Sequence, residues 1–211
     1  FLHVIKDVCR NNTIFKGDPV GDVVAAIEKT KGKLKCLSMV ECILSKSIFE
    51  AIAKYGGNLR SLLIRSSNYS RSDRAEDPND KSMDADDGAM ARVLRGCPKL
   101  KFLFIDPEGR DTLFGNASWE ALRDGACPEL AVLWVHDVQD SENRLNHSSA
   151  DPDTIRQALA DGTPLRRSLK MLMINPDANC ESRLVIGSDG KVSKDRLMGE
   201  ERTTIISTGT P

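Results

Sequence analysis

The sequence has no long apolar run and no excess of either charge. Its longest uninterrupted apolar stretch, residues 130–135, is six residues long, far short of the ~20 that a membrane-spanning helix needs. Thirty Lys and Arg residues balance thirty-one Asp and Glu residues, which leaves a net charge of −1. That balance argues against a nucleic-acid binder that works by bulk positive charge. We therefore expect a partner that is neither a nucleic acid nor a membrane.

Motifs that carry catalysis or metal binding are also missing. There is no Gly-x-x-x-x-Gly-Lys-Ser/Thr phosphate loop, no Gly-x-Ser-x-Gly elbow and no Cys-x-x-Cys pair. Residues 84–88 resemble a calcium loop, but the glycine comes one residue early and Arg95 stands where a bidentate Glu is required. Helix capping by Asp84, Asp86 or Asp87 explains these acidic residues better. We expect no catalytic residue, no cofactor and no metal ion.

The six cysteines show no spacing typical of a disulfide framework. Cys97 and Cys127 each precede a proline in matching contexts, which predicts a repeated packing role as buried, reduced thiols. Reduced cysteines favour an intracellular location, cytoplasmic or nuclear. Four Asn-x-Ser/Thr triplets favour a secreted protein instead, but polar loops generate such triplets by chance.

An internal repeat dominates the chain. Five segments share the form Leu-x-x-Leu-x-apolar, namely residues 34–39, 59–64, 100–105, 130–135 and 169–174. A sixth, degenerate copy is expected around residues 2–8. Each of the five follows a stretch with apolar residues at three- and four-residue intervals, which predicts helices at residues 23–27, 48–53, 90–94, 119–122 and 155–159. Turns with Gly or Pro then lead into most of the strands, so the unit is helix, turn, short strand and loop.

This unit resembles the leucine-rich repeat, most closely the cysteine-containing subtype in the substrate-binding region of F-box proteins. The copies that carry the likeness are residues 84–105, with Cys97-Pro98, and residues 117–135, with Cys127-Pro128. The loops are longer and less regular than in the family, and the usual Asn or Cys after the strand is mostly missing.

The resemblance implies an α/β right-handed solenoid with a parallel sheet on its concave face and helices on its convex face. Residues 1–175 would form the irregular repeats, and residues 176–211 a C-terminal cap or tail with a β-hairpin around Asp189-Gly190. It further implies a protein-interaction module that binds protein partners, with substrate recognition in an F-box type ubiquitin ligase as the leading use. The alternative is an α/β enzyme with a doubly wound sheet and its site at the carboxyl edge of the strands. Strand order distinguishes the two, because only the doubly wound sheet reverses it.

In the leucine-rich repeat family, the two residues that flank the second leucine of each segment, and the next alternate residue, face away from the helices. The expected protein-binding residues on that face are Leu63, Arg65, Phe102, Phe104, Asp106, Val132, Trp134, His136, Met171 and Met173. A solvated face should be largely polar, whereas this one becomes apolar from the third repeat onward. Either it is a contact surface with a polar rim, or the C-terminal tail covers it and makes it core.

Overall fold

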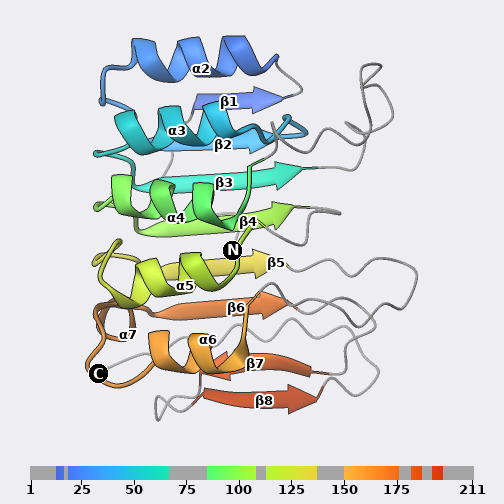
Figure 1. The fold of residues 1–211 in the computed structure, drawn as a ribbon, viewed down its shortest axis with the longest axis vertical. Coiled ribbons are helices and arrows are strands. Elements are labelled where there is room, and N and C mark those ends of the chain that lie inside the picture. Colours follow the sequence, from blue (N-terminus) through green and yellow to red (C-terminus); the bar gives the residue numbers. More distant parts are fainter. Residues whose placement is uncertain are drawn as a thin grey trace.

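The chain folds as an α/β structure in which short helices alternate with the strands of one sheet (Figure 1). The computed structural model describes residues 13–16, 19–66, 85–107, 113–136, 150–175, 182–186 and 192–196. Its strands are β1 (Thr13–Lys16), β2 (Cys36–Val40), β3 (Ser61–Ser66), β4 (Phe102–Pro107), β5 (Val132–His136), β6 (Met171–Asn175), β7 (Ser182–Ile186) and β8 (Val192–Arg196). Its helices are α2 (Val20–Lys29), α3 (Lys46–Tyr55), α4 (Asp87–Gly96), α5 (Asn116–Arg123), α6 (Pro152–Ala158) and α7 (Pro164–Ser168).

The strands lie in the sheet in the order in which they follow one another along the chain, from β1 to β8. The first six pair in parallel, and β7 and β8 continue the sheet with antiparallel pairs. Strand β3 pairs with both β2 and β4, which confirms the predicted order of the Leu-x-x-Leu-x-apolar segments. A doubly wound sheet requires a reversal of strand order, and the described strands contain none.

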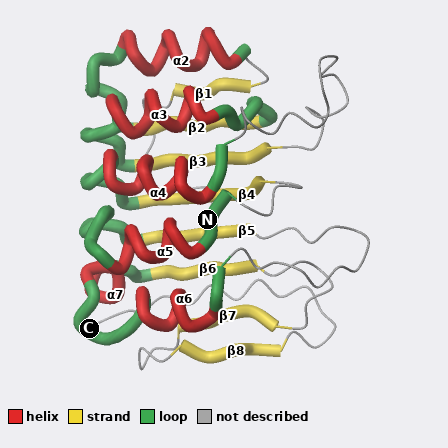
Figure 2. Tube along the Cα trace, in the orientation of Figure 1, coloured by secondary structure: helices red, strands yellow, loops and turns green. Residues whose placement is uncertain are grey.

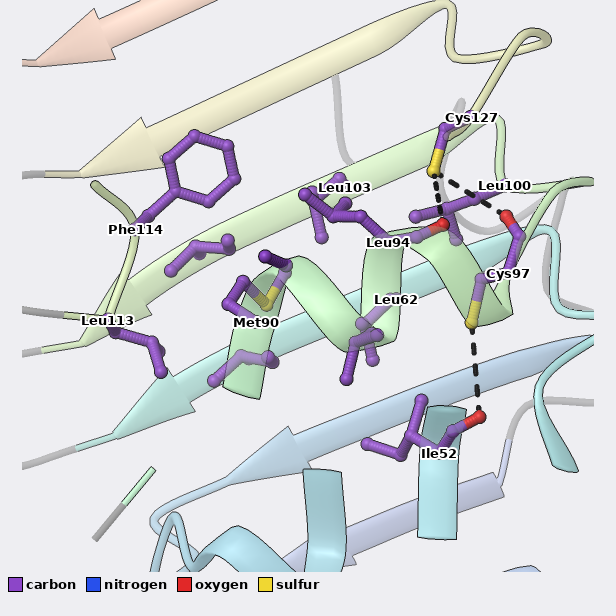
Figure 3. Packing of buried hydrophobic residues seen from close by; sticks show 14 of the residues in the cluster. Ile52, Leu62, Met90, Leu94, Cys97, Leu100, Leu103, Leu113, Phe114 and Cys127 are labelled. Carbon is purple, nitrogen blue, oxygen red and sulfur yellow. Dashed lines mark hydrogen bonds between the residues drawn. The ribbon is translucent and has the colours of Figure 1, made fainter. Parts of the chain in front are cut away.

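The helices form one layer beside the sheet, in which α2, α3, α4, α5 and α6 each contact the next (Figures 1 and 2). All five predicted helical stretches are confirmed, with bounds that extend or shift them by a few residues. Alternate strand residues face this layer because side-chain direction alternates along a strand. Leu62 and Leu103 are partners in register, and both are buried close to Met90 and Leu94 of α4 (Figure 3). One continuous core therefore runs between the sheet and the helices.

Each strand begins two residues after the first leucine of its segment, later than the sequence suggested. The five first leucines are buried in the turns that precede the strands: Leu34, Leu59, Leu100, Leu130 and Leu169. The backbone of each turn forms a hydrogen bond within the turn. Leu100 N–H donates to the Cys97 carbonyl oxygen, and Leu130 N–H donates to the Cys127 carbonyl oxygen, each at 3.0 Å. These N–H groups are thus unavailable for pairing with a neighbouring strand.

Two elements depart from the repeat pattern. The predicted sixth copy around residues 2–8 lies outside the described residues. On the side of β2 away from β3, the sheet continues with β1, which lacks the leucine frame. The Gly- and Pro-containing segment at residues 161–164 does not lead directly into a strand, because the short helix α7 intervenes. Thr163 Oγ1 accepts a hydrogen bond from Arg166 N at 3.2 Å, and Pro164 occupies the first helical position, where no N–H is needed.

Strands β7 and β8 pair with each other in the segment where the sequence predicts a C-terminal hairpin, and the predicted turn around Asp189-Gly190 lies outside the described residues. The two strands are antiparallel, with register pairs from Ser182↔Arg196 to Ile186↔Val192. Strand β7 also pairs with β6 through Ile174↔Leu184, so the hairpin extends the sheet in its own plane. The described part of the C-terminal tail therefore continues the sheet edge and does not lie across its face.

The predicted capping role of the acidic segment before α4 is also confirmed. Asp86 caps its own helix, because its Oδ1 accepts a hydrogen bond from Ala89 N at 2.8 Å. Asp87 caps the following helix instead: its carboxylate accepts hydrogen bonds from the N–H groups of Gly115 (2.7 Å), Ala117 (2.7 Å) and Ser118 (3.0 Å). Helix α5 has no side-chain cap from its own N-cap residue, Gly115. Asp87 thus ties two successive helix–strand units together.

Candidate functional site

The residues predicted to face away from the helices line up across the sheet as expected. The middle column is in register from Ser38 through Leu63, Phe104 and Trp134 to Met173. The column before it runs from Cys36 through Ser61, Phe102 and Val132 to Met171. Parallel pairing without slippage brings these residues, which lie up to 137 positions apart in sequence, onto one surface.

Six apolar side chains on this helix-free face are half-buried, and together we call them the apolar patch: Leu63, Phe102, Phe104, Val132, Trp134 and Met171. The rings of Phe104 and Trp134 are in contact, with centroids 4.9 Å apart and planes tilted by 57°. Tilted pairs at this separation are favourable, since the edge of one ring meets the face of the other. Neither ring is enclosed in the way that the core leucines are, because each keeps part of its surface accessible.

A charged pair borders the apolar patch at the carboxyl ends of β3 and β4. Arg65 and Asp106 are register partners, and Arg65 Nε lies 3.6 Å from Asp106 Oδ2. The Arg65 side chain is 65% exposed and that of Asp106 only 17% exposed, so the pair is solvated on one side. An exposed pair of this kind adds little stability. The guanidinium group of Arg65 remains accessible to a ligand. Arginine is among the residues that most often anchor a binding interface.

Two of the predicted site residues, His136 and Met173, lie in described strands, but their side chains are outside the described part. Their backbone positions are established: His136 is in register with Asn175, and Met173 with Trp134. Ile14, which lies two strands from Leu63 in the middle column, is not predicted by the leucine frame, because β1 lacks that frame. Ile14 is in register with Ser38, extends the middle column to the sheet edge and is 63% exposed. Alternating β-branched and aromatic residues in Thr13-Ile14-Phe15 were the available signal.

Cys97 and Cys127 occupy equivalent places in successive units, beneath the turns that lead into β4 and β5. Both are buried and form no disulfide, as predicted. Cys36 and Cys42 are also buried and form no disulfide, whereas Cys9 and Cys180 lie outside the described residues. The Cys127 Sγ lies 3.2 Å from the Leu94 carbonyl oxygen and 3.5 Å from that of Cys97 (Figure 3). Cys97 Sγ points in the same way toward the Ile52 carbonyl, 4.0 Å away. Each thiol therefore lies against the C-terminal end of the helix of the preceding unit, α3 for Cys97 and α4 for Cys127.

Burial makes both thiols hard to ionise, and this has a consequence for stability. Burial raises the pKa of the Cys97 thiol from 9.0 to about 12. Burial, together with the adjacent Cys97, also raises the pKa of Cys127. In both cases the anion is disfavoured because it would lose its hydration. A thiol of this kind is a packing group at neutral pH and not a nucleophile.

We expect the free energy of unfolding to fall as the pH rises from 9 towards 12. Below pH 9 the thiols are protonated in both states, whereas above it the unfolded chain loses these protons first. The folded state then holds more protons than the unfolded chain. Each thiol therefore lowers the free energy of unfolding by up to about 1.4 kcal/mol per pH unit. Urea unfolding across this range should show a shallower decline for Cys97→Ala than for the wild type. An unchanged slope in the variant would contradict the assignment.

No described helix is long and apolar enough to cross a membrane. Within the parts of the chain that the structure describes, no group of three or more His, Cys, Asp or Glu side chains is arranged to hold a metal ion.

Comparison of the chain with protein-family models, with curated proteins and with solved structures finds no match.

Proposed function

We propose that this chain is a leucine-rich-repeat-like solenoid that works as a protein-interaction module, with the helix-free face of the sheet as its contact surface. The observation that carries the proposal is the apolar patch, which combines a Phe104–Trp134 pair with a charged border at Arg65 and Asp106. An apolar centre with an aromatic anchor and a polar rim is the usual anatomy of a protein contact surface.

The architecture supports this use because, in the described part of the chain, the helices that pack in succession form one layer on one side of the parallel sheet (Figure 1). Chain-order pairing of β1 to β6 and the single helix layer are what a leucine-rich solenoid requires. The competing interpretation is that the C-terminal tail covers the patch; the described strands of that tail, β7 and β8, extend the sheet edge. Half-burial of the patch side chains favours a contact surface over a closed core.

The specific use that we propose is substrate recognition in an F-box type ubiquitin ligase, by resemblance of the two Cys-Pro repeats to that family. The matched placement of Cys97 and Cys127 beneath successive turns supports the resemblance, since it shows that both copies pack in the same way. An F-box encoded elsewhere in the same gene product would support this assignment. A complete gene product without one would restrict the proposal to a protein-interaction module.

We expect Trp134→Ala to weaken binding of the partner by tenfold or more while leaving the fold intact. Loss of one large apolar contact removes on the order of 2 kcal/mol, and about 1.4 kcal/mol corresponds to one decade in affinity. The first measurement is the thermal midpoint of the variant, which should stay close to that of the wild type. A stability loss of about 3–5 kcal/mol, typical of core Trp truncation, would mean that the patch is core.

The second measurement uses wild-type protein, Trp134→Ala and a matched control, Lys54→Ala, as baits in parallel purifications. Lys54 is exposed on α3, on the far side of the molecule's helix layer from the patch. A partner retained by the wild type and by Lys54→Ala, but lost with Trp134→Ala, is the expected result. Equal retention by all three baits would contradict the proposed contact surface.

A further inference from the structure

A row of basic residues borders the apolar patch along the amino ends of the strands. The residue after the first leucine of each repeat is Lys35, Arg60, Lys101, Ala131 and Lys170 in turn. Four of the five positions are therefore basic, and we call Lys35, Arg60, Lys101 and Lys170 the basic row. Lys35, Arg60 and Lys170 are exposed and Lys101 is half-buried.

Backbone hydrogen bonds hold these residues side by side. The Lys35 carbonyl accepts hydrogen bonds from the N–H groups of Arg60 (2.7 Å) and Ser61 (3.1 Å). The Arg60 carbonyl accepts in the same way from Lys101 (2.9 Å) and Phe102 (3.1 Å). The pattern continues from Lys101 to Ala131 and from Ala131 to Lys170, so each member is anchored to the next. The row lies in the short turns that precede the strands, at the amino ends of the strands (Figure 2).

The arrangement places like charges next to one another, which is unfavourable between neighbouring strands. Ion pairing offsets part of this repulsion at Lys101, whose Nζ lies 3.2 Å from Glu129 Oε2. The chain as a whole has a net charge of −1, so the row is a local concentration of positive charge and not a reflection of composition. Carboxylates supplied by a bound partner would relieve the repulsion, in the manner of complementary interface charges.

The row borders the patch at the amino ends of β4 and β6, where a basic residue directly precedes a patch residue in the chain. Lys101 precedes Phe102, and Lys170 precedes Met171. Four inter-strand steps of about 4.8 Å give the row a length of about 19 Å, which an extended peptide of about six residues would span. The apolar patch alongside it favours a protein over a nucleic acid, whose backbone offers charge but no aliphatic side chains.

On these grounds we propose that the partner contributes an extended segment rich in both acidic and apolar residues. Its apolar side chains contact the apolar patch and its carboxylates meet the basic row, so that the segment runs across the strands. This inference rests on the proposed function and adds the chemistry of the partner and its direction on the sheet.

The test is selection of peptides from a random dodecapeptide display library on the full chain. The expected result is enrichment of peptides that combine Asp or Glu with apolar residues. The best of these, made synthetically, should bind the wild type with an affinity that falls as salt is added. Reversal of the row by Lys35→Glu, Arg60→Glu, Lys101→Glu and Lys170→Glu should weaken its binding by about tenfold or more.

A matched control reverses four charges on the helix layer, Lys29→Glu, Lys54→Glu, Arg92→Glu and Arg95→Glu, all of them exposed. It should keep most of the affinity, and thermal unfolding should show that both quadruple variants are folded. An equal loss in both variants would overturn the proposal, since bulk charge would then explain the binding.

Other outcomes separate this inference from the proposed function. Enriched peptides without acidic residues, whose binding is still lost with Trp134→Ala, would overturn the basic row while leaving the contact surface standing. A labelled twelve-residue oligothymidylate that binds more tightly than any peptide, and only with the row intact, would assign the row to nucleic acid instead. Failure to enrich any peptide would count against both proposals.

Discussion

Replacing Asp87 with alanine is expected to lower the free energy of unfolding by about 3 kcal/mol, several times the effect of an ordinary surface substitution. The Asp87 carboxylate accepts hydrogen bonds from three backbone N–H groups at the start of α5. The Ser118 hydroxyl also donates a hydrogen bond to it, at 2.5 Å. Ser118 is completely buried, so its hydroxyl would be left without this acceptor in a site closed to water. Hydrogen bonds to a charged group contribute about 1.5–3 kcal/mol each, and they are not additive.

Asp86→Ala is the matched control, because it removes the neighbouring carboxylate from the same helix start. Asp86 is exposed and accepts one backbone N–H, that of Ala89, so the usual N-cap loss of about 1 kcal/mol is expected. Asp87→Asn keeps one oxygen acceptor and should fall between the two alanine variants. Chemical denaturation of the four proteins at neutral pH measures the series. Equal losses for Asp86→Ala and Asp87→Ala would show that Asp87 is only a local cap and not a link between units.

Gly96→Ala is expected to destabilise the chain by about 3 kcal/mol through a backbone collision. A Cβ at position 96 would lie 2.2 Å from the Ala53 carbonyl oxygen and 2.7 Å from its Cα, on the adjacent helix α3. Backbone atoms cannot rotate away as a side chain can, so α3 and α4 would have to separate. Overpacking that shifts backbone typically costs about 1–3 kcal/mol, and this contact is at the severe end.

Gly57→Ala makes the same chemical change where nothing lies within 4 Å of the new methyl group. Gly57 has no left-handed backbone conformation that would strain alanine. That variant should be neutral or slightly stabilised, because alanine reduces the conformational freedom of the unfolded chain. Thermal and urea unfolding of the two variants isolate the packing effect from the general effect of losing a glycine. A Gly96→Ala variant as stable as Gly57→Ala would show that α3 and α4 tolerate a wider separation than the structure has.

Both changes act on contacts between successive units, and so they also bear on the proposed contact surface. The apolar patch exists only while β3, β4, β5 and β6 stay in register, since each strand contributes one or two of its side chains. Asp87 and Gly96 lie in the helix layer, where they set how closely α3, α4 and α5 stack. We therefore expect destabilised variants to lose partner binding only in proportion to the unfolded fraction, unlike Trp134→Ala.

The periodicity of the chain determined much of this fold on its own. The leucine frame predicted five parallel strands in chain order, and the three- and four-residue spacing predicted the helices before them. Both follow from local rules, since a strand alternates its side chains and a helix repeats its face every three to four residues. The columns that end at Met173 and Met171 are predictable from the sequence for the same reason. The matched Cys-Pro contexts likewise predicted two buried thiols.

Tertiary structure decided what depends on distant partners. Asp87 lies next to Asp86, and only the packing of α4 beside α5 shows that the two carboxylates cap different helices, because the N–H groups bound by Asp87 are about thirty residues away. Strand β1 lacks the leucine frame, and its four residues form a strand because they pair with β2. The basic residues are scattered singly through the repeats, and they become one row only when carbonyls such as those of Lys35 and Arg60 bond to the next unit. A local pattern predicts which way a side chain points, but which other side chains it meets there depends on the register between units.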